Sequence, residues 1–378
     1  MSPSAATQRT TSMRETSVAG AGRVAPRLVT MNDIAREAGV SQSTVSRVLN
    51  ATSSSIPISD ETRERVLKAA RRTGYRPNPL ARGLRGSRTM LLGVIVREIT
   101  DPFFAGAIEA VSTEAASRGY NVVLGHAHAR ADEAIVLRSV LETRHVDAIL
   151  LLGDMSDQPR LIEDLQGSHV PVVALWQGAL HGVPAVSVDN RHGIESALDH
   201  LYSLGHRRIA FISGRPLGDI EERQAAYDDW VRRHAVRLPR GYLQRVANEP
   251  AAGERALIAL LGLSDPPTAI VCSTDQLAIG VLHGAASAGL RVPDDLSVTG
   301  FDDLPLSVFA VPSLTTVRMP VREMAARAVE MAIDPPRSPT EPVVEILPPE
   351  LVVRESTGPP NPTRSGGTRP RELGRTTT

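Results

Sequence analysis

Cysteine is nearly absent from this chain of 378 residues. Cys272 is the only one, which excludes an intramolecular disulfide and any Cys-x-x-Cys metal or redox motif, and indicates a reducing compartment. The sequence also lacks an apolar run long enough to span a bilayer. Residues 1–27 lack the apolar core of a secretory signal. We therefore expect a cytoplasmic protein that does not bind to a membrane.

The motifs of several enzyme classes are also missing. No GxSxG pattern occurs, and no histidine is followed by glutamate, which excludes HExxH. The single lysine, Lys68, follows leucine, so no P-loop Gly-Lys exists, and no GxGxxG follows the first predicted strand. His126 and His128 alternate as on a strand end, where a solvated turn is more frequent than a metal pair. We predict no catalytic residue, no metal and no cofactor, and hence no enzyme.

Basic charge is concentrated near the N-terminus, although the whole chain has no net charge. Residues 30–88 contain eleven Arg or Lys and five Asp or Glu, a net charge of +6. Residues 1–29 carry +3, and the remainder from Thr89 onward carries −9. A small basic segment joined to a large acidic one indicates a polyanion-binding module attached to a second function.

Two short helices are predicted in the stretch TMNDIAREAGVSQSTVSRVLN. Thr30 followed by Asp33 resembles a capping box, so the first helix should begin near Met31 and end at Gly39. Ser41 can cap the second helix. Polar side chains at helical spacing then form one continuous face of the second helix: Ser43, Ser46, Arg47 and Asn50.

That polar face has two interpretations. A solvated helix surface is the commoner reason for a polar stripe, but such a surface usually carries Glu–Lys pairs. Here the side chains are short hydrogen-bonding groups and a single arginine, which suit base edges and phosphates in a DNA major groove. We therefore interpret the stretch as a helix-turn-helix.

The same residues closely resemble the head of LacI/GalR-family transcription repressors across the twenty residues MNDIAREAGVSQSTVSRVLN. The resemblance implies that Gln42 and Ser43 are the principal base-reading pair at the start of the recognition helix. It also implies that Arg47 contacts a base or a phosphate. The remaining residues of this helix that we expect at the DNA are Thr44, Ser46 and Asn50.

A third helix and a short linker follow. SDETRERVLKAARRTGY predicts a helix capped by Ser59. In RPNPLARGLRG, Asn78 followed by proline can start a helix that is too short to be stable alone, so an ordinary linker is one interpretation. The resemblance instead implies a hinge, residues 77–88, that folds on operator binding and lies in the minor groove. Leu84 would wedge open the central base step, and Ala81 would let two hinges approach each other.

From Met90 onward the chain alternates strand-like apolar runs, such as MLLGVIV, with helix-like segments. This alternation predicts parallel sheets with helices on both faces. Ligands of such sheets bind beyond the carboxyl ends of the strands, and two facing lobes would form a cleft. The side chains that follow predicted strands include Trp176, Asp189, Asn190, Thr274, Asp275, Asp302 and Asp303.

The segments LGHRRIAFISG, TDQLAIG, GLRVPDDLSVTGFDD and PSLTTVRMP resemble the family's effector-binding body, whose fold is shared with periplasmic sugar-binding proteins. The implied fold is a two-lobed α/β body, with parallel sheets flanked by helices, behind an all-α helix-turn-helix head. The expected domains are a disordered tail 1–29, a head 30–76, the hinge 77–88, a body 89–357 and a disordered tail 358–378. Within the body we expect an N-lobe, 89–188 plus 319–345, and a C-lobe, 189–318 plus 346–357.

The resemblance also implies ligand contacts. Arg223 matches an arginine that grips ligand hydroxyls or a carbonyl, and Asp302 matches an aspartate that accepts hydrogen bonds from the ligand. Thr274 and Asp275 occupy a further polar position of the site. Trp176 stands where an aspartate is common and could stack on a sugar ring or a base. For Asp275 and Asp302 the alternative is to hold loops together, and for Trp176 it is packing between the lobes.

The chain departs from the family pattern at two positions. Val188 stands where an aromatic residue often closes the pocket, and Met319 where a polar residue often contacts the ligand. Asp303 is expected to be structural. With Arg223 as the only matched cation, the acidic and hydroxyl lining favours a neutral, hydroxyl-rich ligand, a sugar or a nucleoside, over a phosphorylated one.

We therefore predict a homodimeric transcription repressor that binds pseudo-palindromic operator DNA and is controlled by a small carbohydrate-like effector. The homodimer is expected because one small head makes too few base contacts for specificity. One alternative is a regulator controlled by a protein co-regulator. A solute-binding protein is less favoured, since it would have no use for a basic helix-turn-helix head.

Overall fold

The computed structural model describes residues 29–50, 57–75, 88–127, 146–168, 170–176, 182–236, 238–335 and 343–362. The chain divides into two compact units, residues 1–78 and 79–378. Among the described residues, no helix combines the length and the apolar character needed to cross a membrane.

The first unit is the head, built from α1 (Met31–Ala38), α2 (Gln42–Asn50) and α3 (Asp60–Thr73). Thr30 caps α1 as predicted, because its hydroxyl accepts from Asp33 N and the Asp33 carboxylate accepts from Thr30 N. Gly39 ends α1 in the left-handed conformation, with φ of 64°. Ser41 and Ser59 each accept a backbone N–H at the start of the following helix, which confirms both predicted caps.

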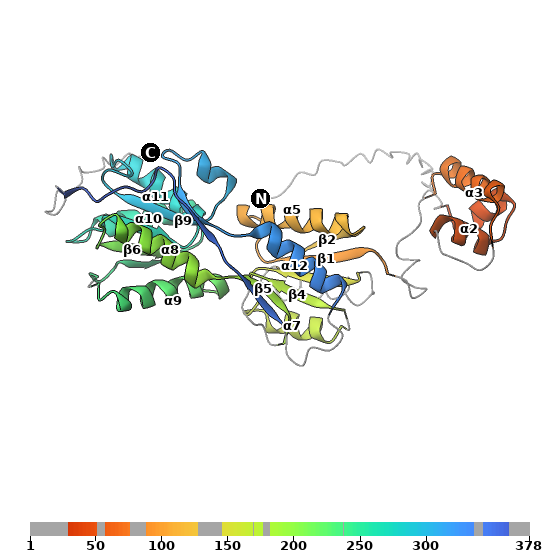
Figure 1. Cartoon of the computed structure of the whole chain (residues 1–378), viewed down its shortest axis with the longest axis horizontal. Coiled ribbons are helices and arrows are strands. Elements are labelled where there is room, and N and C mark those ends of the chain that lie inside the picture. Colours follow the sequence, from red (N-terminus) through yellow and green to blue (C-terminus); the bar gives the residue numbers. More distant parts are fainter. Residues whose placement is uncertain are drawn as a thin grey trace, which may run out of the picture. The chain divides into compact units, whose positions relative to one another are not determined.

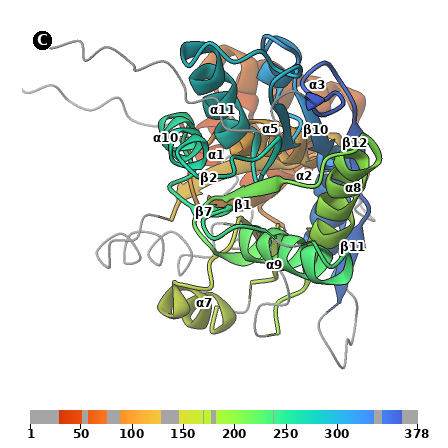
Figure 2. The same cartoon turned by 90° about the vertical axis from the view of Figure 1, so that its left-hand side faces the viewer.

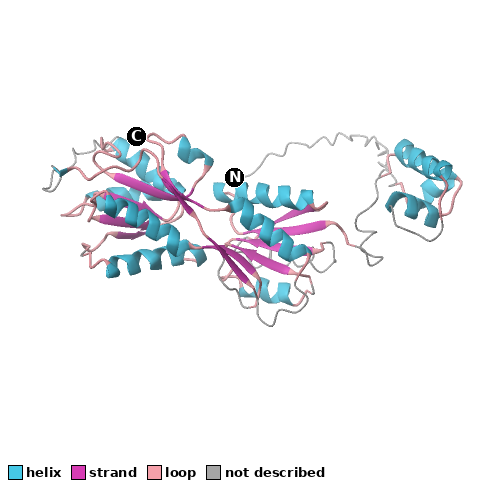
Figure 3. Cartoon of the chain, in the orientation of Figure 1, coloured by secondary structure: helices cyan, strands magenta, loops and turns pink. Residues whose placement is uncertain are grey.

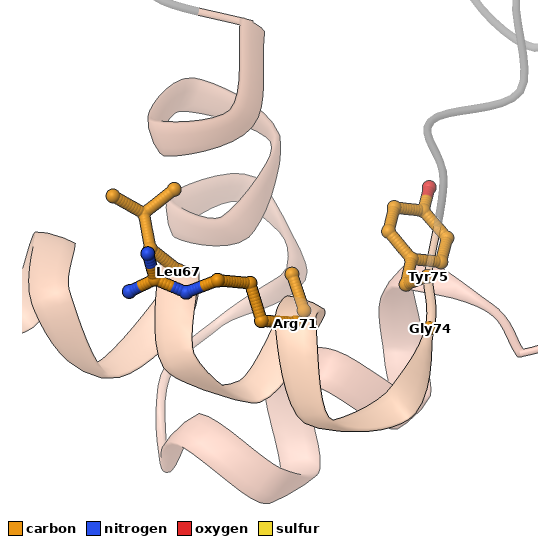
Figure 4. A pocket seen from close by; sticks show the side chains of 5 residues that line it. Leu67, Arg71, Gly74 and Tyr75 are labelled. Atoms are coloured by element: carbon orange, nitrogen blue, oxygen red, sulfur yellow. The ribbon is translucent and has the colours of Figure 1, made fainter.

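The three helices of the head pack around one small core, and α2 and α3 are labelled in Figure 1. The buried side chains of this core are Ile34, Ala35, Ala38, Val45, Val48, Val66, Ala69 and Ala70. A shallow pocket of about 220 Å³ lies at the carboxyl end of α3. Figure 4 shows Leu67 and Arg71 on successive turns of the helix and Tyr75 beyond Gly74 at the edge of this pocket.

The second unit begins with a six-stranded sheet in the order β11-β5-β4-β3-β1-β2, in which every pair is parallel. Its strands are β1 (Leu91–Val96), β2 (Asn121–His126), β3 (Ala148–Leu152), β4 (Val172–Leu175), β5 (Ala185–Val188) and β11 (Val344–Leu347). The helices α5 (Pro102–Ser117) and α12 (Val321–Ile333) cover one face and α7 (Pro159–Gln166) covers the other (Figure 1). This N-lobe buries apolar side chains on both faces of its sheet, as the continuous apolar runs predicted.

The C-lobe has a second six-stranded sheet in the order β12-β10-β9-β8-β6-β7. Its strands are β6 (Ile209–Ser213), β7 (Leu243–Arg245), β8 (Ala269–Cys272), β9 (Ser297–Asp302), β10 (Thr315–Arg318) and β12 (Glu350–Val352), with β12 antiparallel to β10. Figure 2 shows α10 (Pro250–Leu261) and α11 (Asp275–Ser287) on one face, and α8 (Asn190–Ser203) and α9 (Gly218–Arg233) on the other. A short 3₁₀ helix, η1 (Pro305–Val308), follows β9.

The chain passes between the two sheets three times, after β5, after β10 and after β11 (Figure 3). This confirms the two-lobed α/β fold. The predicted lobe boundary, at about residues 345–346, falls inside β11, which pairs with β5 along its whole length. The last crossing lies between Leu347 and Glu350 instead.

The body also extends beyond both of its predicted ends. Arg88, assigned to the hinge, donates hydrogen bonds to Ile333 O at 3.0 Å and to Tyr120 Oη at 3.2 Å in the N-lobe. Gly358, assigned to the disordered tail, accepts from His206 Nε2 at 2.8 Å and donates to Ser297 Oγ at 3.1 Å. These contacts attach Arg88 and Gly358 to the body, and the described chain continues to residue 362.

Candidate functional site

The predicted recognition surface of the head is the N-terminal half of α2. Gln42 and Ser43 are exposed in its first turn, whereas Val45 and Val48 face the core. Arg47 is half-buried one turn later. Ordinary helical geometry therefore places Gln42, Ser43 and Arg47, the predicted base-reading residues, outside the packed face. The other predicted residues of this helix are Thr44 and Ser46, which are half-buried, and Asn50, whose side chain lies outside the described residues.

Helix α3 supplies the basic charge of the head. Its exposed cationic side chains are Arg63, Arg65, Lys68, Arg71 and Arg72. Arg72 is bound to Glu37 of α1, with 2.7 Å between Nε and the carboxylate. Exposed guanidinium and ammonium groups beside a polar recognition helix suit a surface that attracts nucleic-acid phosphates.

The hinge residues predicted to contact DNA, Asn78, Ala81 and Leu84, lie outside the described residues. The structure does describe the start of the body, directly after the predicted hinge. There the Asp147 carboxylate accepts from Thr89 N at 2.7 Å, Thr89 Oγ1 at 2.8 Å and Met90 N at 2.9 Å. Sequence reasoning missed Asp147, because it precedes β3, 57 residues from Met90. It fixes the first residues of the body against the N-lobe sheet.

A cavity of about 520 Å³ lies between the two lobes at the carboxyl ends of their strands. Aromatic rings form its N-lobe wall: Trp176, directly after β4, meets Phe103 edge to face with 5.0 Å between ring centroids. Phe104 lies at 6.4 Å from Trp176 in a similar orientation. Trp176 thus packs against two rings of its own lobe and also lines the cavity, and its contact with a ligand stays a prediction.

Arg223 of α9 lies on the C-lobe side and is only 3% exposed. Its Nε donates to Asn190 Oδ1 at 2.8 Å, and its Nη1 donates to Ser273 O at 2.7 Å and to Asp302 Oδ1 at 3.3 Å. The guanidinium also stacks on Phe301, with 3.6 Å from Cζ to the ring centroid. These contacts fix the guanidinium plane, so Arg223 is preorganised toward the cavity.

Asp302 ends β9 and lines the same cavity. Burial raises the pKa of its carboxyl well above the usual range, and Arg223 opposes that shift. Its φ of 119° is rare for a residue other than glycine. Trp176 and Asp303 also have positive φ, at 57° and 52°, so unfavourable backbone conformations cluster at the strand ends around the cleft.

Two carboxylates that follow predicted strands, Asp303 and Asp275, are absent from the cavity lining. Asp303 accepts from Arg318 Nε and Arg354 Nη2, each at 2.6 Å, which gives it the structural role expected. Asp275 is fully buried and outside the cavity lining, so it is unsuited to the ligand contact we predicted. Burial raises its pKa to about 6. It holds a loop and a neighbouring strand by accepting from Leu304 N, Ser307 Oγ and Thr316 Oγ1.

Thr274, the partner of Asp275 in the sequence motif, does line the cavity. It caps α11, and its hydroxyl donates to Asn248 Oδ1 at 2.6 Å. Asn248 in turn donates from Nδ2 to Asp101 Oδ2 at 3.0 Å, which links the C-lobe to the start of α5 in the N-lobe. Sequence reasoning missed Asn248 and Asp101. Only the Asp-Pro pair before α5 gave a usable signal, since it marks a helix start.

Two further contacts hold the lobes together at the rim. Asp157 of the N-lobe binds Arg97 of its own lobe through two hydrogen bonds and lies 3.6 Å from Arg215 Nη2 of the C-lobe. Asp154 approaches the start of α9 so closely that a Cβ on Gly218 would lie 2.7 Å from its Oδ2. The cavity is therefore bordered by contacts between opposite lobes.

The comparisons with known proteins agree with this architecture. Residues 30–78 match the family model of bacterial regulatory proteins, lacI family, and residues 198–357 match the periplasmic binding protein-like domain. The transcriptional repressor CytR of Escherichia coli K12 is 36% identical over 309 residues, 81% of this chain and 89% of the relative. The chain belongs to the LacI family. Catabolite control protein A of Priestia megaterium is 34% identical over 308 residues, 80% of this chain and 91% of that protein.

Solved structures of the LacI family share the fold. The Lac repressor dimer bound to operator and the anti-inducer ONPF matches with a TM-score of 0.78 and 26% identity, over 88% of this chain and all of that one. The CelR–cellobiose complex matches with a TM-score of 0.63 and 30% identity, over 87% of this chain and 99% of that one. The protein is thus a DNA-binding transcriptional repressor of the LacI family, and these relatives are regulators rather than enzymes.

No metal site emerges from the residues that the structure describes, since they contain no group of three or more His, Cys, Asp and Glu placed to hold an ion. His126 ends β2, and His128 lies outside the described residues.

Proposed function

We propose that this LacI-family repressor binds a small, hydroxyl-rich, carbohydrate-like effector in the interlobe cleft, and that the effector controls its affinity for operator DNA. The observation that carries the proposal is the buried Arg223, held by four neighbouring groups at the edge of a cavity of about 520 Å³. Among the described residues, Arg223 Nη2 donates only to the weak acceptor Met319 Sδ at 3.6 Å, so a ligand oxygen would be a stronger partner for this buried guanidinium.

The lining favours a hydroxyl-rich ligand that is not an anion. Its C-lobe side offers hydroxyl, amide and carboxylate groups from Thr274, Asn248 and Asp302. Its N-lobe side offers the faces and edges of Phe103 and Trp176. A pyranose or a nucleoside presents hydroxyls on its edge and an apolar surface on its faces, which matches both sides.

Lobe closure gives the effector a route to the DNA. A ligand held between the lobes changes the balance between open and closed arrangements. Arg88 and Asp147 attach the hinge to the N-lobe through Tyr120, Ile333, Thr89 and Met90. Movement of the N-lobe would therefore shift the ends of the two hinges in a dimer and change operator affinity.

A homodimer is supported by exposed apolar side chains on the body. Phe309 is 79% exposed and Val311 is 90% exposed in the segment after η1, and Leu306 and Val308 are also exposed there. Large exposed apolar side chains that are close in sequence mark an interface surface. Two copies would present two recognition helices, which suits a pseudo-palindromic operator. In this arrangement Gln42, Ser43 and Arg47 would read bases, and Leu84 of each hinge would enter the minor groove.

A thermal-shift screen against sugars, polyols, nucleosides and sugar phosphates tests the effector. A ligand at about a hundred times its Kd stabilises by roughly 2.7 kcal/mol, which raises Tm by several degrees. We expect a shift with a hydroxyl-rich compound that carries no negative charge, and none when Arg223→Ala removes the guanidinium. A shift that survives Arg223→Ala would place the ligand elsewhere. If no compound of the panel raises Tm, the result would favour control by a protein co-regulator.

A further inference from the structure

The cleft contains more carboxylates than cations. Among the described residues that line it, six are Asp or Glu and three are Arg. Each of the three arginines is already bound to a carboxylate: Arg97 and Arg215 to Asp157, and Arg223 to Asp302. Asp157 lies outside the lining, so it balances one positive charge of the Arg97 and Arg215 pair without reducing the negative charge inside the cavity.

Within the described residue ranges, Asp219 is a buried carboxylate of the lining that has one oxygen without a hydrogen-bond donor. It is 8% exposed, it lines the cavity at the start of α9, and its Oδ1 has no hydrogen-bond partner among the described residues. Arg223 Nη2 lies 3.9 Å from the Oδ2 of Asp219, and the same guanidinium is already shared with Asp302. Burial raises the pKa of Asp219 to about 6, with Arg223 acting in the opposite direction. A buried carboxylate oxygen of this kind requires a donor, and a charged donor satisfies it best.

A second unsatisfied polar atom belongs to a residue of the cavity wall. Trp176 lines the cavity, is 3% exposed, and its Nε1 likewise has no partner in the described part of the chain. This atom can only donate, so it requires an acceptor such as a hydroxyl. Together with Phe103 it also provides aromatic surface, which attracts cations as well as apolar sugar faces.

We propose that the effector carries a protonated amine that binds Asp219 and at least one hydroxyl that accepts from Trp176, which makes an amino sugar the ligand class. This rests on the proposed function, because it assigns the chemistry of the same cleft. A simple polyamine has no acceptor for the tryptophan, and a neutral sugar has no charge for the aspartate. An amino sugar supplies both in one ring.

Calorimetric titration of the full-length protein with matched sugars tests the amine. The probes are glucose, galactose and mannose, their 2-amino derivatives, and their N-acetylated 2-amino derivatives, all at neutral pH. We expect at least one amino sugar to bind roughly tenfold or more tightly than its parent, as a charge-assisted hydrogen bond provides. The N-acetyl form should lose this advantage, because it keeps the nitrogen but not the charge.

Two variants assign the effect to one side chain. Asp219→Asn should reduce amino-sugar affinity about tenfold and leave the affinity for the parent sugar unchanged. Glu221→Gln removes the same charge from an exposed position of the same helix, outside the lining, and should change neither. Equal losses in both variants would show general attraction by an acidic surface and would overturn the specific site at Asp219.

The outcomes separate this inference from the proposed function. Parent sugars that bind as tightly as their amines would overturn the amine but keep the effector cleft. An amine preference that survives Asp219→Asn would overturn the assignment to that residue. No binding by any of the nine sugars would overturn the amino-sugar class, while a neutral hit in the wider thermal-shift panel would still support the cleft.

Discussion

The recognition helix and the interlobe cleft differ in how their functional residues are brought together. Gln42, Ser43 and Arg47 lie within six residues on one exposed helix. The cleft instead collects side chains from Arg97 to Met319, at the ends of strands in two separate sheets. Helix geometry alone creates the first site, whereas the second exists only when both lobes are folded. A substitution in α2 should therefore alter one function, while one in the cleft should alter stability and ligand binding together.

Arg223→Ala should have the largest effect. It leaves Asp302 and Asp219 buried without their shared cation, and breaking a buried ion pair in this way costs about 3–5 kcal/mol. Urea unfolding would measure the loss in the free energy of unfolding. Arg215→Ala is the control, since its side chain is 69% exposed and should change stability by about 0–1 kcal/mol. Equal losses in the free energy of unfolding would contradict the expectation that the buried arginine at the cleft centre contributes more to stability than the exposed arginine at the rim.

Asp219→Asn should stabilise the ligand-free protein at pH 8. The folded pKa of about 6 lies above the ordinary value of 3.8, because burial and the charges of Glu222 and Asp154 outweigh the attraction of Arg223. The folded state therefore binds the proton more tightly, so the wild-type free energy of unfolding falls as pH rises from about 4 to 6. A shift of about two pKa units corresponds to about 3 kcal/mol as an upper figure.

The measurement is Tm of both proteins between pH 4 and pH 8. The advantage of the Asn variant should be present at pH 8 and should shrink to nothing near pH 4. Asp275 also has a raised pKa but is common to both proteins, so its titration cancels from the difference. If the difference in Tm between the two proteins stayed constant with pH, the charge of Asp219 would not be its cause.

Arg47→Ala should affect the head alone. A good bidentate base contact is worth about 1–3 kcal/mol of discrimination, so operator affinity should fall by that amount while Tm of the body and effector affinity stay unchanged. Fluorescence anisotropy on operator and on random duplexes would separate the alternatives. An equal loss on both duplexes would make Arg47 a phosphate contact.

Thr30→Ala should have the smallest effect. It removes the cap of α1, which is worth about 1 kcal/mol to the head. Operator affinity should weaken slightly through α1, which packs against α2 and α3, while effector binding in the separate body unit stays the same. Thr30→Ser keeps the capping hydroxyl and should restore operator affinity. Altered effector binding in Thr30→Ala would show that head and cleft are not energetically separate.

Sequence reasoning succeeded where a feature depends on neighbours in the chain. The capping box of Thr30 and Asp33 spans three residues, and the alternation of apolar runs with helices fixes the parallel sheets. It failed where tertiary contacts determine the role of a side chain. Asp275 points into the C-lobe because Ser307 and Thr316 donate to it there, which no local pattern reveals.

The missed cleft residues have the same explanation. Asp101 and Asn248 lie 147 residues apart and meet only across the two lobes. Asp219 follows Gly218 in an acidic helix start that resembles any solvated first turn, and only its burial distinguishes it. Local spacing can predict a scaffold and a recognition helix, but the chemistry of a cleft depends on which side chains remain unsatisfied after packing.

The most direct test of the account is reciprocal coupling between the two regions. Operator affinity is measured with and without the compound found in the thermal-shift panel, and affinity for that compound is measured with and without operator. Linkage requires the same factor in both directions, and typical allosteric coupling of 1–3 kcal/mol corresponds to about 5- to 150-fold. We predict equal factors in that range in the wild type and their loss in Arg223→Ala. A factor of one in both directions would contradict control of operator binding from the cleft.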